Sequence, residues 1–112
     1  MRLASLLLGL VVFAGCQTTV SNAQILLERS GTGKATLPAF TAKGPYEVAY
    51  SFDHCGTATG MILIAHVRGL ATPDTLLQSA APVGSGNISG DHGGVVSLEV
   101  QTTCKWAVTV RG

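Results

Sequence analysis

The chain has 112 residues, of which 46% are hydrophobic, and seven Lys or Arg against six Asp or Glu give a formal net charge of +1. Setting Arg2 aside with the N-terminal apolar segment leaves six basic and six acidic residues scattered along the rest. This length suits one domain with one core, and the even spread of charge lacks the basic clusters that bind nucleic acid. We therefore expect a single domain and no nucleic-acid partner.

Residues 1–15 have the pattern of an export signal. Arg2 supplies a positive start, an almost continuous apolar run covers Leu3–Ala14, and small residues follow. The run is too short to cross a bilayer as a helix, which takes about 20 apolar residues. The sequence therefore predicts a signal peptide over residues 1–15 and an exported protein.

The end of this segment, Phe13-Ala14-Gly15-Cys16, resembles the lipobox of bacterial lipoprotein precursors. The resemblance implies cleavage before Cys16, a diacylglyceryl group on its sulfur, and lipid anchoring in the cell membrane or outer membrane. Each buried methylene of such an anchor contributes roughly 0.8 kcal/mol, so two acyl chains hold a protein stably. Residues 16–23 would then form an uncharged tether. The alternative is a secretory signal cleaved after Ala23, which would release a free domain.

Two cysteines remain once Cys16 is assigned to the lipid, namely Cys55 and Cys104. Outside the cytosol such a pair is expected to oxidise, and a loop of about fifty residues closed in this way stabilises a domain by roughly 4 kcal/mol. The alternative, a metal-binding or reactive thiol pair, has neither a CxxC spacing nor a Cys-His cluster to support it. The sequence therefore predicts a Cys55–Cys104 disulfide.

Short runs of strand-forming residues follow one another after the signal. The alternation in Tyr46–Asp53 predicts a half-buried strand, and Met61–Val67, apolar on both faces, predicts a central one. Pro38 places its own segment at a sheet edge or bulge. The expected strands cover residues 24–29, 34–40, 46–53, 61–67, 75–79, 87–89, 96–101 and 105–111, with glycine-rich turn signals at 30–33, 82–86 and 90–94.

This spacing predicts an all-β domain over residues 24–112, an antiparallel β-sandwich of seven or eight short strands. A closed barrel is the alternative architecture. The last two strands are so close in sequence that we expect them to form a hairpin. Cys104 shares the face of Trp106, so we expect the disulfide to lie beside that ring.

Two segments, Ser51–Cys55 and Leu98–Val110, resemble small exported β-sandwich modules of actinobacterial lipoproteins and surface proteins. The shared frame is an aromatic-Asp-Cys strand end, a glycine-rich middle and a final Cys-x-Trp-x-Val-x-Val strand. The resemblance covers about residues 40–111, implies a sandwich fold and carries over no catalytic residue. His54, which stands between Asp53 and Cys55, departs from the pattern and indicates a bulge or a longer corner.

The candidates for chemistry are two Asp-His pairs, at residues 53–54 and 91–92. If the fold brings their loops together, His54, Asp91 and His92 would offer imidazole and carboxylate ligands to a transition metal. The alternative is two solvated loop histidines beside turn-forming aspartates. We interpret His66, inside an apolar strand, as a sheet histidine. No segment has the context of a nucleophile elbow, so we predict no catalytic residue and no cofactor.

We expect a lipid-anchored envelope protein that acts as a non-catalytic binding or accessory module, with an envelope protein, a glycan or a phage component as partner. The glycine-rich loops 83–86 and 90–94 are either a binding rim or plain connections. The alternatives are a small envelope hydrolase or metal-dependent enzyme built on His54, Asp91 and His92, and an inert structural envelope protein. An enzyme requires those three side chains to converge.

Overall fold

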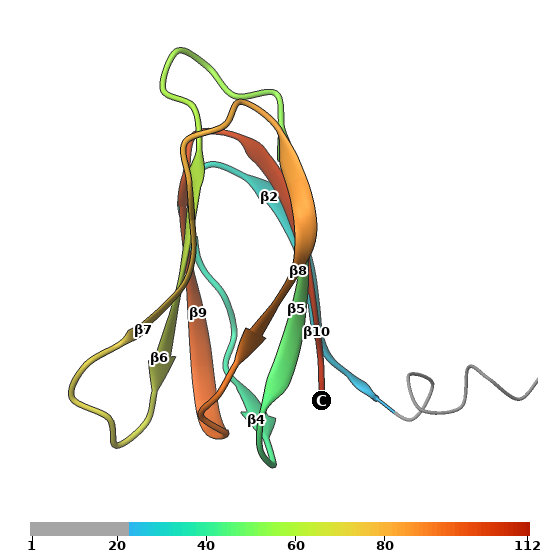
Figure 1. Cartoon of the computed structure of the whole chain (residues 1–112), viewed down its shortest axis with the longest axis vertical. Coiled ribbons are helices and arrows are strands. Elements are labelled where there is room, and N and C mark those ends of the chain that lie inside the picture. The colour runs from blue at the N-terminus through green and yellow to red at the C-terminus, as the bar shows by residue number, and fades with distance from the viewer. Residues whose placement is uncertain (1–22) are drawn as a thin grey trace, which may run out of the picture.

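The computed structural model describes residues 23–112, whose regular structure consists of nine strands in two sheets packed face to face (Figure 1). One sheet has the order β2-β10-β5-β8, the other has the order β3-β9-β6-β7 with β4 also paired to β9, and every pairing is antiparallel. The predicted all-β sandwich is confirmed. The strands are β2 (Ile25–Thr32), β3 (Ala35–Thr36), β4 (Phe40–Ala42), β5 (Tyr46–Asp53), β6 (Met61–Val67), β7 (Asp74–Ser79), β8 (Gly84–Gly90), β9 (Gly94–Thr102) and β10 (Lys105–Arg111).

The strand count exceeds the expected seven or eight because the segment expected at 34–40 forms two short strands. β3 and β4 both pair with β9 and are separated by Leu37, Pro38 and Ala39. Pro38 has no backbone N–H to donate to a ladder, so the chain leaves the sheet there and rejoins it. Residues 23–112 contain no helix long and apolar enough to span a membrane.

The core lies between the sheets and follows the alternation of the strands. In β5 the side chains of Tyr46, Val48 and Phe52 are buried, and Tyr50 is half-buried. Trp106 of β10 is also buried, and its indole N–H donates to the carbonyl of Gly33 at 2.8 Å. The side chains with no exposed surface at all come from β5, β6, β9, β10 and the residue before β10: Val48, Leu63, Ala65, Val96, Leu98, Val100, Cys104 and Val110.

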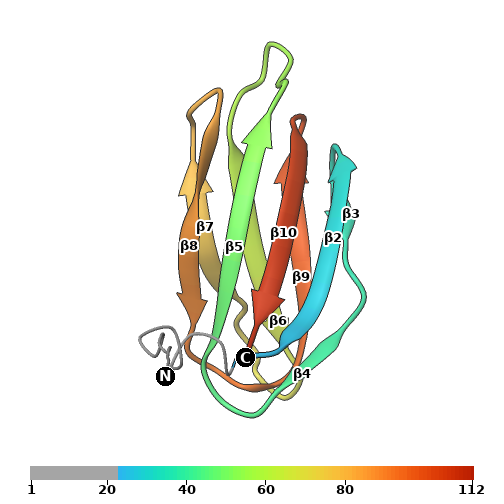
Figure 2. The same cartoon turned by 90° about the vertical axis from the view of Figure 1, so that its right-hand side faces the viewer.

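The predicted disulfide between Cys55 and Cys104 is present. It joins the segment after β5 to the residue before β10, two strands that pair directly through Asp53 and Lys105. We call this end of the sandwich the disulfide end. At the opposite end, the terminal end, Gln24 and Gly112 bond to each other through both backbone groups, so the described chain begins and ends side by side (Figure 2).

The expected hairpin of the last two strands is wrong. β9 and β10 lie in different sheets, each flanked by other strands, and Thr103 and Cys104 carry the chain across. The Thr102 hydroxyl holds this corner, because it donates to the carbonyl of Gly60 at 2.6 Å and accepts from the N–H of Cys104 at 3.0 Å. Because the chain crosses here, β9 and β10 each lie between other strands of their own sheet, and each places one face on the shared core.

The glycine-rich segment at 82–86 is not a loop, which corrects a second expectation. Residues from Gly84 onward belong to β8, in which Gly84, Gly86 and Gly90 pair with the three aromatic residues of β5 (Phe52, Tyr50 and Tyr46, respectively). A Cβ added at Gly84 would lie 2.8 Å from the Phe52 ring, and one at Gly90 would collide with Tyr46. The missing side chains make room for the rings, so glycine here serves strand packing. The turn expected at 30–33 is likewise mostly strand, because β2 runs to Thr32.

We predict that reducing the disulfide lowers the free energy of unfolding by about 4 kcal/mol, because the unfolded chain regains the entropy of a loop of 49 residues. Guanidinium unfolding of the oxidised and the dithiothreitol-reduced protein measures the difference. The double variant Cys55→Ala/Cys104→Ala is the control and should not respond to the reductant. Equal unfolding midpoints for the oxidised and the reduced protein would contradict the prediction.

Candidate functional site

The side chains expected to form a metal site lie at opposite ends of the sandwich. His54 follows the last residue of β5, whereas Asp91 and His92 follow β8, whose last residue pairs with the first residue of β5. The eight residues of β5 separate the two Asp-His pairs by about 26 Å, at roughly 3.3 Å per residue. His54, Asp91 and His92 therefore do not form the joint site that the enzyme alternative requires. Within residues 23–112, no three His, Cys, Asp or Glu side chains are placed to hold a metal ion.

His54 lies at the corner that directly follows the last residue of β5. Its φ of 51° lies in the left-handed region, which is uncommon for a residue other than glycine. The imidazole Nδ1 lies 2.9 Å from the Asp53 carboxylate, and the ring is largely exposed. This pair is thus a local contact on the surface of the disulfide end.

His66 projects from the outer face of β6, with Nε2 2.9 Å from a carboxylate oxygen of Glu99. The side-chain amide of Gln101 donates to the other oxygen of Glu99 at 2.7 Å. The hydrogen bond from Gln101, followed by the one from His66, holds the pKa of Glu99 below its usual value. Ser97 lies opposite His66 but donates its hydroxyl to the carbonyl of Leu37. A Ser-His-Glu relay needs a hydrogen bond from nucleophile to base, and here the serine proton points elsewhere.

A groove of about 640 Å³ lies at the disulfide end, on the outer side of the β6–β7–β9 sheet. This volume falls in the range of ordinary ligand pockets. We call it the disulfide-end groove. It is lined by Lys34, Ala58, Thr59, Gly60, Ile62, Gln78, Ser79, Ala80, Gln101, Thr102 and Thr103.

Threonine hydroxyls brace the rim of the disulfide-end groove. Thr59 donates to the carbonyl of Ala80 at 2.9 Å, Thr102 donates to Gly60, and Thr103 donates to Ala58. These bonds tie the loop after β5 to β7 and β9, and the nearby disulfide fastens the same loop to β10. The loop that forms this rim is therefore fixed by hydrogen bonds and by the disulfide. Its lining comes from four separate chain segments, so no single sequence motif could have predicted it.

A smaller cavity of about 290 Å³ lies at the terminal end, between the edge strands β7 and β8. We call it the β7–β8 cavity. Its lining residues are Pro73, Asp74, Thr75, Leu76, Ser89, Asp91 and His92. His92 Nδ1 lies 2.8 Å from a carboxylate oxygen of Asp74, a contact between a loop and the first residue of β7 that the sequence did not suggest.

The ring of Tyr46 packs against Gly90, which stands between the lining residues Ser89 and Asp91. The side chain is 97% buried, since its exposed fraction is 3%, and its oxygen has no hydrogen-bond partner among residues 23–112. Burial, followed by the negative charges of Asp74 and Asp91, raises the pKa of Tyr46 from 10.0 to about 12. The sequence predicted a buried ring at this position but not the polar atom left without a partner.

The two glycine-rich segments considered as a binding rim are separated as well. Val83 is exposed at the disulfide end, the residues after it enter β8, and the segment from Gly90 to Gly94 turns at the terminal end. The two segments therefore do not form one rim.

Comparisons with models of protein families and with curated protein sequences find no match to this chain.

We predict that the chain loses stability between about pH 10 and pH 12 because of Tyr46. A hydroxyl whose pKa is raised in the folded state keeps its proton after the unfolded chain has released it, so the free energy of unfolding falls as the pH rises through this window. The loss attributable to Tyr46 is roughly 2 kcal/mol. Unfolding curves at the two pH values should show a smaller loss for Tyr46→Phe. Tyr50→Phe, in the same strand, is the control, and an equal loss in both variants would overturn the assignment.

Proposed function

We propose that this chain is a lipid-anchored protein of the bacterial cell envelope whose folded domain is a non-catalytic binding module. The observation that carries the proposal is the placement of the ends. The predicted lipid site, Cys16, precedes Gln24, which lies at the terminal end beside the C-terminus (Figure 2). The disulfide-end groove lies at the opposite end of the sandwich. A protein anchored through Cys16 would thus present the disulfide-end groove away from the bilayer.

The length of the tether agrees with this arrangement. The eight residues from Cys16 to Ala23 reach at most about 28 Å, and none of them is charged. Such a short link would keep the terminal end near the headgroups and leave the groove accessible from the other side. The likeness of residues 51–55 and 98–110 to modules of actinobacterial lipoproteins supports the same location.

The chemistry of the disulfide-end groove favours a polypeptide partner. Its floor includes the apolar side chain of Ile62, and Lys34, Gln78 and Gln101 supply an ammonium group and carboxamides. Its lining contains no aromatic ring on which a sugar would stack. A groove with an apolar floor and amides at its edge suits an extended peptide segment, whose backbone groups need both donors and acceptors.

The location is tested by intact-mass analysis of the protein recovered from the membrane fraction of the producing cell. We expect a chain that begins at Cys16 and carries a diacylglyceryl group, with Cys55 and Cys104 oxidised. Cys16→Ser should abolish the modification and move the protein to the soluble fraction. A soluble native protein that begins at Gln24 would refute the lipid anchor.

Binding through the disulfide-end groove is tested with a photo-crosslinking residue placed at Gln78 in membranes from the same cells. We expect discrete cross-linked products that disappear when a competing unlabelled protein is added. The matched control is Asn87, an exposed residue on the outer face of the other sheet. Equal cross-linking from both positions, or none from Gln78, would favour an inert structural protein instead.

A further inference from the structure

We propose that the terminal end of the sandwich docks on the lipid bilayer, with Leu70 entering the apolar boundary below the headgroups and with Arg68 and Lys43 binding lipid phosphates. This inference rests on the proposed function, because the lipid on Cys16 is what would bring this end to the membrane. It goes further than the anchor, since it gives the folded domain its own contacts with lipid and therefore a preferred orientation.

Residues 68–73 form the loop that joins β6 to β7 at the terminal end (Figure 1). All six residues of this loop are exposed, and Arg68 is the only charged one. Among residues 23–112, Arg68 makes no ion pair. The loop thus carries one cation together with the apolar residues Leu70, Ala71 and Pro73, which is the combination that lies well at a membrane interface.

A tight turn holds Leu70 away from the core. The backbone N–H of Leu70 donates to the carbonyl of Val67 at 3.0 Å, and Gly69 has a φ of 91°, as the third residue of a type II turn requires. Leu70 is 45% exposed, whereas Val67, three residues earlier, is buried. Because the turn already fixes the backbone, little conformational entropy is lost when the leucine enters an apolar phase.

The start of the described chain indicates which apolar phase is within reach. Gln24 lies at the terminal end, and the eight residues from Cys16 to Ala23 reach at most about 28 Å. A lipid on Cys16 would therefore hold this end at the bilayer surface. Large apolar side chains are exposed at three places within residues 23–112, and two of them, Ile25 and Leu70, lie at this end.

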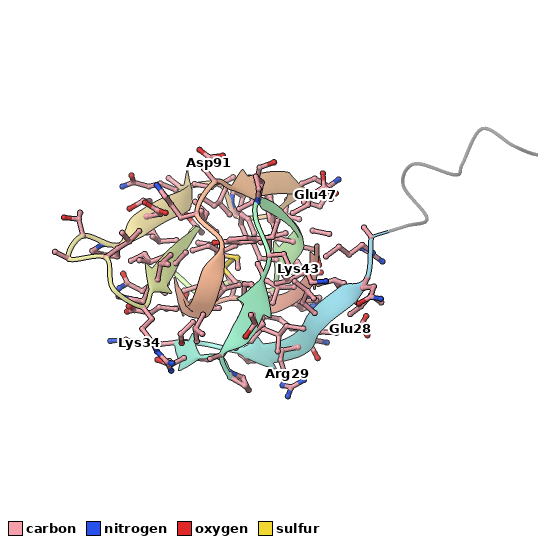
Figure 3. All side chains as sticks on the ribbon, turned by 90° about the horizontal axis from the view of Figure 1, so that it is seen from below. Glu28, Arg29, Lys34, Lys43, Glu47 and Asp91 are labelled. Carbon is pink, nitrogen blue, oxygen red and sulfur yellow. A yellow bond between two sulfur atoms is a disulfide. The ribbon has the colours of Figure 1, made fainter. Side chains whose placement is uncertain are left out.

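The distribution of charge at this end suits a layer of phosphates. Figure 3 looks at the terminal end and shows Lys43 near its middle, with the loop between β6 and β7 on one side and β2 on the other. Lys43 is exposed and makes no ion pair within residues 23–112. Asp91 and Glu47 lie toward one margin of the same view, and the carboxylate of Asp74 contacts His92. A lipid phosphate can thus approach Lys43 from below.

The contact is weak by itself, and the anchor makes it effective. One leucine at the acyl boundary contributes only modest affinity, as does each cation near an anionic surface. A short tether, however, holds the loop beside the bilayer at an effective concentration of about millimolar or higher. The guanidinium of Arg68 can also donate two parallel hydrogen bonds to one phosphate. We therefore expect docking in the lipid-modified protein, where the tether supplies this concentration.

The test uses the lipid-modified protein in vesicles of phosphatidylethanolamine and phosphatidylglycerol, with a small apolar fluorescent label on the thiol introduced by Leu70→Cys. With Cys16 acylated and Cys55 and Cys104 oxidised, the introduced thiol is the only reactive one. We expect a blue-shifted emission and a loss of fluorescence when nitroxide-labelled lipids are included. Val83→Cys is the matched control, because Val83 is also an exposed apolar residue but lies at the disulfide end, and its label should show neither effect.

The outcomes separate this inference from the anchor on which it rests. If mass analysis shows the lipid on Cys16 but neither label responds, or both respond equally, the anchor stands and the docking is refuted. A blue shift at position 70 without quenching by the nitroxide lipids would show that a protein, such as a second copy of this chain, covers the loop instead. A chain that carries no lipid would refute the anchor and the docking together.

Substitution of the cations tests the phosphate contacts. Either Arg68→Gln or Lys43→Gln should lower the ratio of docked to undocked protein about fivefold, because one cation near an anionic surface is lost. The ratio is measured from the quenched fraction of the label at position 70. Lys105→Gln makes the same change of charge at the disulfide end, at the first residue of β10, and should leave the ratio unchanged. Equal effects of all three substitutions would exclude specific contacts of Arg68 and Lys43 with the lipid.

Discussion

The packing of aromatic side chains from β5 over the glycines of β8 is the constraint on which both ends of this domain depend. Tyr46, Tyr50 and Phe52 lie on the core side of β5, and each faces a glycine in the neighbouring strand. A side chain at Gly84 or Gly90 would occupy the space of a ring. β8 therefore contributes little side-chain volume to the core at these positions, and the aromatic rings of β5 fill that space. At the terminal end the ring of Tyr46 packs against Gly90, the last residue of β8.

The two ends of the sandwich are chemically different, although the same strands build both. The disulfide end is braced by the Cys55–Cys104 link and by threonine hydroxyls, and its groove is lined by small, hydroxyl and amide side chains. The terminal end holds the junction of the chain ends and an acidic cavity. An antiparallel sandwich gathers its loops at its two ends, so a chain with neutral overall composition can still carry two distinct surfaces. The net charge of the chain does not reveal this difference between the two ends.

Local pattern in the sequence was sufficient for the strands and for the disulfide. The alternation of Tyr46–Asp53 and the apolar run Met61–Val67 predicted two strands with the bounds that the structure has. The partners of strands were harder to predict, and the expected hairpin of the last two was wrong, because proximity in sequence does not decide which sheet a strand joins. The role of the glycines at 82–86 was also predicted wrongly. In β8 its role is set by the rings across the ladder, which a pattern of turn-forming residues cannot reveal.

The sequence by itself determined the all-β class, the approximate positions of the strands and the partner of each described cysteine, since these follow from period-two hydrophobicity, turn residues and the small number of thiols. Only the tertiary structure decided which polar side chains meet. It separated His54 from His92, joined His92 to Asp74 and left the Tyr46 hydroxyl without a partner. The reason is physical: these contacts join residues that are distant in sequence, and their distances depend on strand order and sheet packing, which local periodicity does not encode.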